Sequence, residues 1–465
     1  MKSKTVGRAL MQRVAGDVLW DDRTLTRFST DMSMYQVRPL VVVVPRDLAD
    51  VVAVVEFARD GGIPLTARGG GSSTAGSALG RGIILSFPRQ GPMNQLVAFN
   101  EVDGEPRATV EPGLLHDELQ AFLRERDLTL PADPSSGPIC VLGGNIATKA
   151  SGPHALKHGS IDRYLHSLQF VTLDGEMVDT AVPNTIPAHI REGILSLQKD
   201  ILADEVLVEQ LRDRQDMKIA SGYNMFTFIR DREIGEFVAQ LLVGSVGTLG
   251  VVTEATLRAE PNVPGKATTL LYFRDLDQAG EAVQHIRSLG VAATEPMNHR
   301  SIAIARARRP DLEAPDGEAH MLLVEYEGPE RYQQIDQVKQ LLGRKRYELA
   351  LEPVTVEGEE AQADLWTMRK SLLPAVRSAR RDRKAISLVN EVGVPVAHLA
   401  GFIRDVEAVF ERRDLVAAIY GHAGSGNLHL RPLFDPSDPD LPALLQQVAD
   451  EVYEAVFRYD GTITA

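Results

Sequence analysis

The chain has 465 residues, which at about 100 to 200 residues per domain predicts two to four folded domains. Its 50 Lys and Arg residues stand against 64 Asp and Glu residues, and the net charge of −14 argues against a nucleic-acid partner. A single cysteine, Cys140, excludes an internal disulfide and an iron–sulfur cluster held by this chain alone, and favours a reducing compartment. Without a long apolar run or a signal-peptide core, we expect a cytoplasmic protein, with peripheral contact at the inner face of a membrane left open.

The first half of the chain reads as an α/β domain, which we place at residues 1–260. A β-branched run from Leu40, an amphipathic helical stretch ending at Gly61 and Gly62, and a short apolar run together predict a β-α-β unit. A glycine-rich loop at 68–82 then leads into a strand at 82–87. Further elements are expected as a strand at 108–113, a helix at 114–126, a proline-rich turn at 131–138 and a hairpin at 167–178.

The second half starts a new pattern after a proline-rich stretch at 260–265. Strands and helices alternate from there, which predicts a ferredoxin-like α+β substrate (cap) domain over 261–415. Residues 416–465 are expected as a separate C-terminal segment, with two strands around a glycine-rich loop and a final helix. The predicted fold class of the whole chain is α+β.

The loop that begins Arg68-Gly69-Gly70-Gly71-Ser72-Ser73 is the first candidate binding site. It follows a strand, and consecutive glycines let backbone amides approach an anionic group closely, which suits a pyrophosphate. A plain connecting loop is the alternative. A Rossmann fingerprint is disfavoured, because a strand rather than a helix follows the glycines.

Three further segments follow the loop in a fixed order, at 131–136, 143–152 and 247–251. Together with the loop they resemble the FAD-binding domain of the vanillyl-alcohol-oxidase (PCMH-type) flavoproteins, and the resemblance covers nearly the whole chain. It implies FAD, bound non-covalently because Ser72 and Ser73 stand where some members carry a flavin-linked histidine. Val246 replaces the usual acidic residue, and Cys140 is expected to be a buried apolar residue. The implied cofactor-binding residues are Arg68, Gly69, Gly70, Gly71, Ser72, Ser73, Gly76, Ser77, Pro131, Asp133, Ser136, Gly143, Gly144, Asn145, Thr148, Ser151, Gly152, Gly247, Gly250 and Val251.

A second constellation lies near the C-terminus, where His422 and His429 flank a glycine-rich bend. Two histidines at this spacing could face one metal ion, and two ordinary histidines are the alternative. The segment resembles the His-x-Gly-Asp-Gly-Asn-x-His motif of FAD-dependent D-2-hydroxy-acid dehydrogenases, a branch with D-lactate and D-2-hydroxyglutarate dehydrogenases and glycolate oxidase subunits. The resemblance implies that His422 and His429 bind a divalent metal, commonly zinc, beside Asn427. Ser425 replaces the usual aspartate.

The same resemblance suggests other residues of the site. An arginine of the helix around 364–376 clamps the substrate carboxylate in the family, which points to Arg369, and a solvated basic residue is the alternative. Asn390 and Glu391 fall where relatives carry a polar or acidic pair, with structural capping as the alternative. Tyr223 matches a segment that lines the flavin, although a buried, hydrogen-bonded tyrosine explains it as well.

The family continues with an Ala-Glu-His-Gly segment, whose glutamate is the third metal ligand and whose histidine is a candidate base. The printed chain reaches 461–465 where that segment begins in relatives, so we expect a truncated form with an incomplete metal site. Some relatives continue into a cysteine-rich iron–sulfur region.

The predicted function is an FAD-dependent dehydrogenase that oxidises a small D-2-hydroxy acid, of the D-lactate, D-2-hydroxyglutarate or glycolate type, to the 2-oxo acid, with hydride passing to FAD N5. One alternative is an FAD oxidase of an alcohol that has no carboxylate. Another is a flavin-binding electron-transfer subunit without its own catalysis. The expected partners are the hydroxy acid and a downstream electron acceptor, whether a quinone, an iron–sulfur protein or a carrier protein, and a homodimer is left open.

Overall fold

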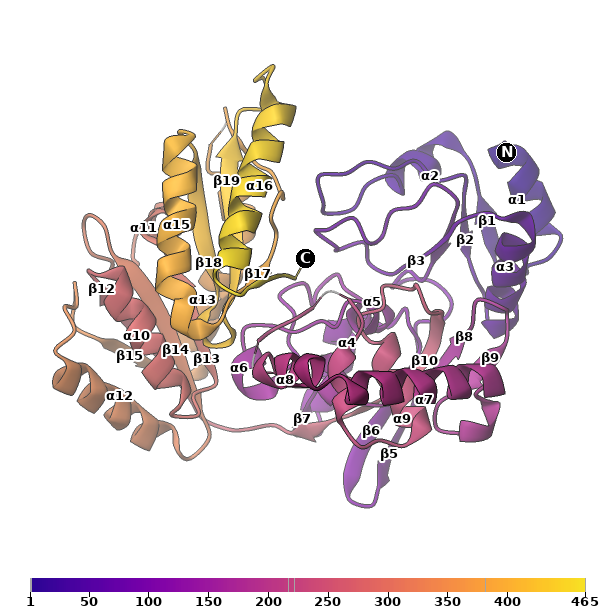
Figure 1. The fold of residues 1–465 in the computed structure, drawn as a ribbon, viewed down its shortest axis with the longest axis horizontal. Helices are drawn as coiled ribbons and strands as arrows, with labels where there is room; N and C mark the ends of the chain where they lie inside the picture. Colours follow the sequence, from indigo (N-terminus) through magenta and orange to yellow (C-terminus); the bar gives the residue numbers. More distant parts are fainter. Residues whose placement is uncertain (1, 216, 221, 381, 465) are drawn as a thin grey trace. The chain divides into compact units, whose positions relative to one another are not determined.

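The computed structural model describes residues 2–215, 217–220, 222–380 and 382–464. The chain divides into two compact units (Figure 1). Unit 1 consists of Met1–Ser151, Ser160–Gln215 and Ala220–Asn262, and unit 2 of Gly152–Gly159, Asp216–Ile219 and Val263–Ala465. Both units combine helices with sheets, which confirms the predicted α+β class.

A four-stranded sheet in unit 1 carries the predicted β-α-β unit. Its order is β1 (Asp17–Leu19), β2 (Val41–Val44), β4 (Ile83–Ser86), β3 (Leu65–Arg68), and β4 pairs parallel with both β2 and β3. The strands β2 and β4 are apolar and almost entirely buried, as expected of parallel strands covered on both faces. Asp47 caps helix α3 (Leu48–Gly61), and Gly62 ends it in the left-handed conformation at φ +58°. Helices α1 (Ser3–Met11) and α2 (Asp22–Arg27) also belong to this part.

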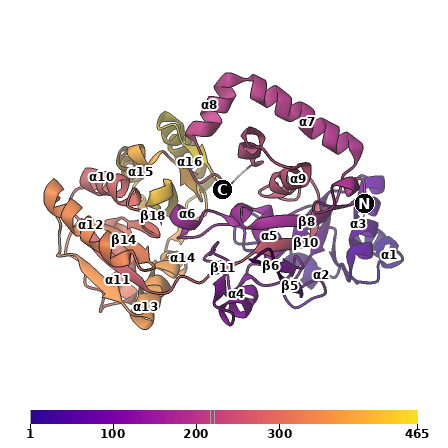
Figure 2. The same ribbon diagram turned by 90° about the horizontal axis from the view of Figure 1, so that it is seen from below.

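The second sheet of unit 1 is antiparallel, in the order β5 (Leu96–Val102), β6 (Glu105–Val110), β10 (Val251–Arg258), β8 (Leu165–Val171), β9 (Met177–Asp179). Alternate residues of β10 are buried, so one face of this strand packs on the core. The helices of this part are α4 (His116–Arg124), α5 (Leu142–Ala147), α7 (Ala188–Ala203), α8 (Glu205–Asp213) and α9 (Ile234–Leu242), with a short pair of strands, β7 (Leu128–Thr129) and β11 (Glu260–Pro261). Figure 2 shows α7 and α8 following one another along the outer side of this unit.

Unit 2 is built on one antiparallel sheet. Its first four strands lie in the order β15 (Val354–Glu357), β12 (Lys266–Phe273), β14 (His320–Glu327), β13 (Ala293–Met297). In chain order this is the 4-1-3-2 arrangement of a ferredoxin-like fold, as predicted. The sheet continues through β18 (Val416–His422), β19 (Asn427–Phe434), β17 (Val392–Gly393) and β20 (Thr462–Ile463), and β16 (Lys384–Ala385) also pairs with β19.

The C-terminal segment therefore differs from the separate part that the sequence suggested at 416–465. A backbone pairing of Met297 with Tyr420 joins β18 to the edge of the ferredoxin-like strands, so the segment completes the same sheet and shares its core. An exposed strand edge offers unpaired amides and carbonyls, and β18 pairs with β13 at its Met297 end.

Helices cover both faces of this sheet. One face packs against α10 (Leu276–Arg287), α12 (Arg331–Lys345), α15 (Leu399–Arg412) and α16 (Leu441–Arg458), with Phe402 and Val452 in its core. The other face packs against α11 (His299–Arg308), α13 (Glu359–Lys370) and α14 (Leu372–Arg377), around Met368 and Tyr420. In the described ranges no helix is both long and apolar enough to cross a membrane.

Candidate functional site

The predicted cofactor loops of unit 1 lie against one another. A Cβ atom on Gly69 would come within 2.4 Å of the Val141 side chain, and one on Gly70 within 2.1 Å of the Ile139 carbonyl oxygen. Only glycine allows the 69–71 loop to approach the segment before α5 this closely. Within the 131–136 turn, the Ser136 carbonyl accepts hydrogen bonds from the amides of Ile139 and Cys140, which ties that turn to the same place.

The loop after Gly247 joins this group through α5. The amide of Gly244 donates to the Ile146 carbonyl at 3.0 Å, and that of Val246 to the Ala147 carbonyl at 2.9 Å. Val246 has a φ of +53°, so the residue in the usual acidic position is held in a left-handed turn. Gly250 packs against Phe170 just before Val251 begins β10. The four predicted segments, apart from Gly152, thus gather in one part of unit 1.

Several of the predicted cofactor residues have structural contacts of their own. The Arg68 guanidinium donates to the carbonyl of Thr30 at 2.9 Å and stacks on the ring of Phe28. Ser73 accepts from the amide of Ser77 at 3.2 Å, inside the loop that contains Ser72 and Gly76. These contacts fix the shape of the loop.

In the segment around α5, some polar side chains make structural hydrogen bonds and one hydroxyl, that of Ser151, makes none with the described residues. Asn145 is buried, with its amide 3.2 Å from His116 Nδ1, and Thr148 donates to the Gly144 carbonyl. The buried hydroxyl of Ser151, just before Gly152, has no hydrogen-bond partner among the described residues, which fits a polar ligand at this position.

In unit 2 the predicted metal motif forms the hairpin β18–β19. His422 pairs with Asn427, and Tyr420 with His429, across the two strands. Gly426 turns the chain at φ +69°, where a Cβ atom would lie 1.9 Å from the Val394 carbonyl oxygen. Because side chains alternate along a strand, both histidines project to the sheet face covered by α13 and α14.

His422 is held by a residue that the sequence did not indicate, Glu295 on β13. The distance from His422 Nδ1 to Glu295 Oε1 is 2.7 Å, and Glu295 is fully buried. The second carboxylate oxygen lies 2.6 Å from Arg369, which also donates to the carbonyl of Gly421 at 2.9 Å. A carboxylate only accepts, so His422 carries its proton on Nδ1 and leaves the Nε2 lone pair for a ligand.

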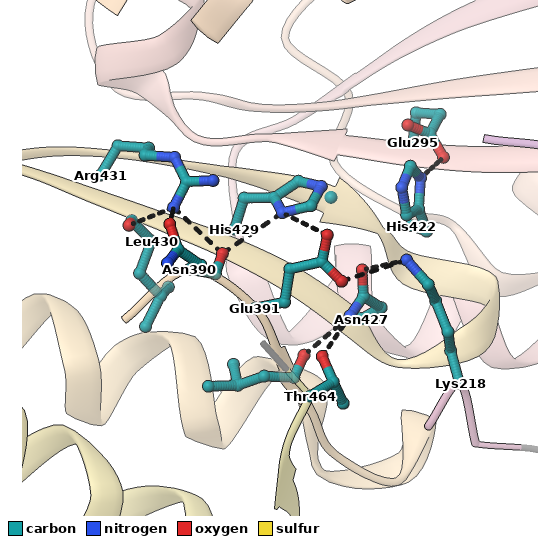
Figure 3. A network of polar contacts seen from close by, with 12 residues as sticks. Lys218, Glu295, Asn390, Glu391, His422, Asn427, His429, Leu430, Arg431 and Thr464 are labelled. Carbon is teal, nitrogen blue, oxygen red and sulfur yellow. Dashed lines mark hydrogen bonds and ion pairs between the residues drawn. The ribbon is translucent and has the colours of Figure 1, made fainter. Parts of the chain in front are cut away.

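His429 has comparable neighbours (Figure 3). Its Nδ1 lies 3.4 Å from the Asn390 carbonyl oxygen and 3.6 Å from Glu391 Oε1, and both atoms are acceptors. Lys218 lies 3.2 Å from the other Glu391 oxygen and 3.3 Å from Asn427 Oδ1. Burial lowers the pKa of His429 well below its usual value. Burial raises the pKa of the Glu391 carboxyl, but Lys218, His429 and His422 together outweigh it and hold that pKa below the usual range.

The two histidines face one another, with ring centroids 5.3 Å apart and planes at 84°. No hydrogen bond to either Nε2 atom comes from the described residues, and a carboxylate lies behind His422, which is the arrangement expected of metal-binding histidines. Over the described ranges, however, no group of three or more His, Cys, Asp and Glu side chains is placed to hold a metal ion. The structure therefore offers two nitrogen ligands, and the zinc site stays a prediction.

A second polar cluster lies elsewhere on β14, around two buried carboxylates. Glu325 lies 2.7 Å from His154 and accepts a hydrogen bond from Trp366. Glu327 lies 2.9 Å from Lys157 Nζ and 2.8 Å from His158 Nε2. These ion pairs fasten the segment Gly152–Gly159, which contains α6 (Ala155–His158), to the sheet of unit 2.

Three residues near the site were missed by the sequence reasoning: Glu295, Lys218 and Arg431. Glu295 and Lys218 lie far from the motif in the chain, so no local pattern connects them to it. Arg431 follows His429 by two positions and shares its strand face, a signal that the alternation in β19 could have provided. Tyr223, which the sequence placed near the flavin, is half-exposed, and its hydroxyl lies 3.0 Å from that of Thr248.

Comparison with known families matches both parts of the chain. The FAD binding domain matches residues 39–181, and the C-terminal domain of FAD linked oxidases matches residues 264–465. A solved structure of alkyldihydroxyacetonephosphate synthase superposes with a TM-score of 0.67 at 17% identity, covering 96% of this chain and 78% of that one, and so shares its fold.

Relatives of known name span nearly the whole chain. The D-2-hydroxyglutarate dehydrogenase of Pantoea ananatis is 27% identical over 97% of this chain and 46% of the relative. The glycolate oxidase subunit GlcD of Bacillus subtilis is 26% identical over 100% of this chain and 88% of the relative. The chain thus spans about half the length of the D-2-hydroxyglutarate dehydrogenases that it matches.

Proposed function

We propose, from the premise that this chain belongs to the FAD-linked oxidases, that it is an FAD-dependent dehydrogenase of small D-2-hydroxy acids. The observation that carries the proposal is the face of unit 2 on which His422, His429 and Arg369 lie together, with both imidazoles presenting Nε2. A 2-hydroxy acid has a hydroxyl and a carboxylate on neighbouring carbons. Two imidazoles can hold a metal ion that binds the hydroxyl, and a guanidinium can bind the carboxylate.

Unit 1 would hold the flavin. The glycines at 69–70 and 143 let neighbouring backbone segments approach closely, and the buried Ser151 hydroxyl has no hydrogen-bond partner in the described parts of the chain, so it can donate to a ligand. Bound FAD would accept the hydride from C2 of the substrate at N5. The non-covalent attachment implied by Ser72 and Ser73 belongs to the same proposal.

Unit 2 would bind and orient the acid. Arg369 is 5% exposed, and its Nε atom has no hydrogen-bond partner in the described parts of the chain, so it retains a donor for the substrate carboxylate although Glu295 neutralises its charge. A divalent metal such as zinc would be held by Nε2 of His422 and His429 and would lower the pKa of the substrate hydroxyl. Asn427 is fully buried and accepts from Lys218, which fixes the turn between the two histidines.

Reoxidation requires an electron acceptor, for which we propose a separate redox partner. Support comes from the relatives named as subunits of glycolate oxidase. A quinone, an iron–sulfur protein and a carrier protein would each serve as the acceptor.

Anaerobic flavin bleaching tests this function. The purified, FAD-loaded chain is mixed with D-lactate, D-2-hydroxyglutarate or glycolate, with and without added zinc, and the absorbance near 450 nm, roughly the usual oxidised-flavin band, is followed. We expect one acid to bleach the flavin and His422→Ala to slow this bleaching. Bleaching by a simple alcohol but by no hydroxy acid would favour an alcohol oxidase. A flavin that dithionite reduces but no acid reduces would favour an electron-transfer subunit.

A further inference from the structure

The segment Gly152–Gly159 leaves unit 1 in the chain and returns to it at Ser160. A β-bridge between Ser151 and Ser160 holds the two ends of the segment together. Gly159 has a φ of +72°, a left-handed conformation that favours glycine, and turns the chain back towards its starting point. The segment is therefore a closed excursion whose base belongs to unit 1 and whose own residues belong to unit 2.

Two buried carboxylates of β14 fix this excursion to the sheet of unit 2. Glu325 lies 2.7 Å from His154. Glu327 lies 2.9 Å from Lys157 Nζ and 2.8 Å from His158 Nε2. A buried charge that loses its partner is costly, so the excursion is held firmly in place.

The fixed excursion packs one side chain, Leu156, onto the turn between the two predicted metal ligands. A Cβ atom on Gly424 would lie 2.5 Å from Leu156 Cδ2 and 2.6 Å from Thr294 Oγ1. The turn thus lies between Leu156 and β13, without room for a side chain at its centre. Leu156 also packs against the core cluster that contains Ala423 and Leu428. In so close a packing, a shift of Leu156 must shift the turn as well.

The base of the same excursion belongs to the predicted flavin site. Ser151 directly precedes it, and the buried Ser151 hydroxyl has no hydrogen-bond partner among the residues described. Gly152, its first residue, is itself one of the predicted cofactor-binding residues. A bound cofactor that accepts from this hydroxyl would order the base of the excursion. One short stretch of chain therefore joins the predicted flavin site to the histidine turn.

We propose that Leu156 is a positioning residue, through which bound FAD orders the turn that carries His422 and His429. This inference rests on the proposed function, because it concerns the residues that would bind the hydroxy acid. Two sites joined by one packed element are coupled, and such coupling commonly changes affinity by about 5- to 150-fold. The coupling is reciprocal, so a metal ion held by the two histidines should slow the release of FAD.

Hydrogen exchange of the full chain, followed by mass spectrometry with and without FAD, tests this role. In the wild type we expect FAD to slow amide exchange at 421–428 by at least about fivefold, along with exchange in the loop 69–77. In Leu156→Ala, FAD should change exchange at 421–428 by less than about twofold and still protect 69–77. A purely structural role would speed exchange of the turn equally with and without FAD, and so leave the ratio unchanged.

The same coupling can be measured from the holoenzyme if the chain does not fold without FAD. The rate of FAD release is then followed with and without zinc. Zinc should slow this release by at least about fivefold in the wild type and by less than about twofold in Leu156→Ala. Equal rates with and without zinc in the wild type would overturn the proposal.

The matched control is Leu444→Ala on α16, which shortens another half-buried leucine packed against the same core and should keep the full effect of FAD on the turn. Glu327→Gln loosens the excursion without altering Leu156 and should reduce the effect as Leu156→Ala does. A wild-type turn whose exchange FAD does not slow, or a Leu156→Ala variant with the wild-type response, overturns the role of Leu156. Failure of the proposed function is seen separately, as a flavin that no hydroxy acid bleaches.

Discussion

Replacing Glu327 with glutamine should destabilise unit 2 by about 2 kcal/mol at pH 7, because the carboxylate anchors the segment Gly152–Gly159. Burial raises the pKa of Glu327, but His158 and Lys157 outweigh it and lower that pKa from 4.5 to about 2. A pKa difference of one corresponds to about 1.4 kcal/mol, so the fall from 4.5 to about 2 gives a ceiling of about 3.5 kcal/mol. Lys157 is 37% exposed, so solvent screening reduces the contribution to about 2 kcal/mol.

The stabilisation by the Glu327 carboxylate should decrease as the pH falls. The folded state lowers the pKa of this carboxyl, so the stabilisation is present above about pH 4.5 and is lost as the pH falls towards about 2. Urea unfolding followed by fluorescence, at pH 7, 5 and 3.5, measures the free energy of unfolding of wild type and Glu327→Gln. Glu411→Gln, at an exposed position, is the matched control. The reasoning would be refuted if wild type and Glu327→Gln differed by less than about 0.5 kcal/mol in free energy of unfolding at pH 7. It would also be refuted if this difference did not become smaller below pH 4.5.

Glu295→Gln should weaken zinc binding about 10- to 100-fold in calorimetry while the flavin spectrum stays unchanged, because the carboxylate orients His422; equal zinc affinity would remove Glu295 from this role. Gly70→Ala should lower the FAD content of the purified protein, since its Cβ would lie 2.1 Å from the Ile139 carbonyl oxygen, and full flavin occupancy would contradict the packing described. Ser151→Ala should raise the Kd for FAD about fivefold through loss of one hydrogen bond of about 1 kcal/mol, and an unchanged Kd would show that its hydroxyl does not contact the cofactor.

The sequence could predict the parts of this protein that depend on local patterns. The run Val41–Val44 followed by an amphipathic helix predicted a β-α-β unit, and the alternation after Pro264 predicted the ferredoxin-like strands. The spacing of His422 and His429 placed them on one hairpin, as the register now shows.

What the sequence could not predict depends on strand pairing between distant segments. Glu295 meets His422 because β13 pairs with β18, over a separation of more than 100 residues. Lys218 reaches Glu391 from a short stretch that lies between parts of unit 1 in the chain. Nor does a helical pattern around Arg369 reveal that its guanidinium has a buried partner, because side-chain ion pairs follow from the folded geometry.

The division of the chain has a consequence for protein engineering. Gly152–Gly159 and Asp216–Ile219 belong to unit 2 but are encoded within unit 1. A cut at 262 would therefore remove His154 and Lys218 from the sheet and leave the carboxylates of Glu325 and Glu391 without these partners. The two units are not interchangeable modules, and a chimera between homologues should keep these two short segments and the C-terminal sheet from the same parent.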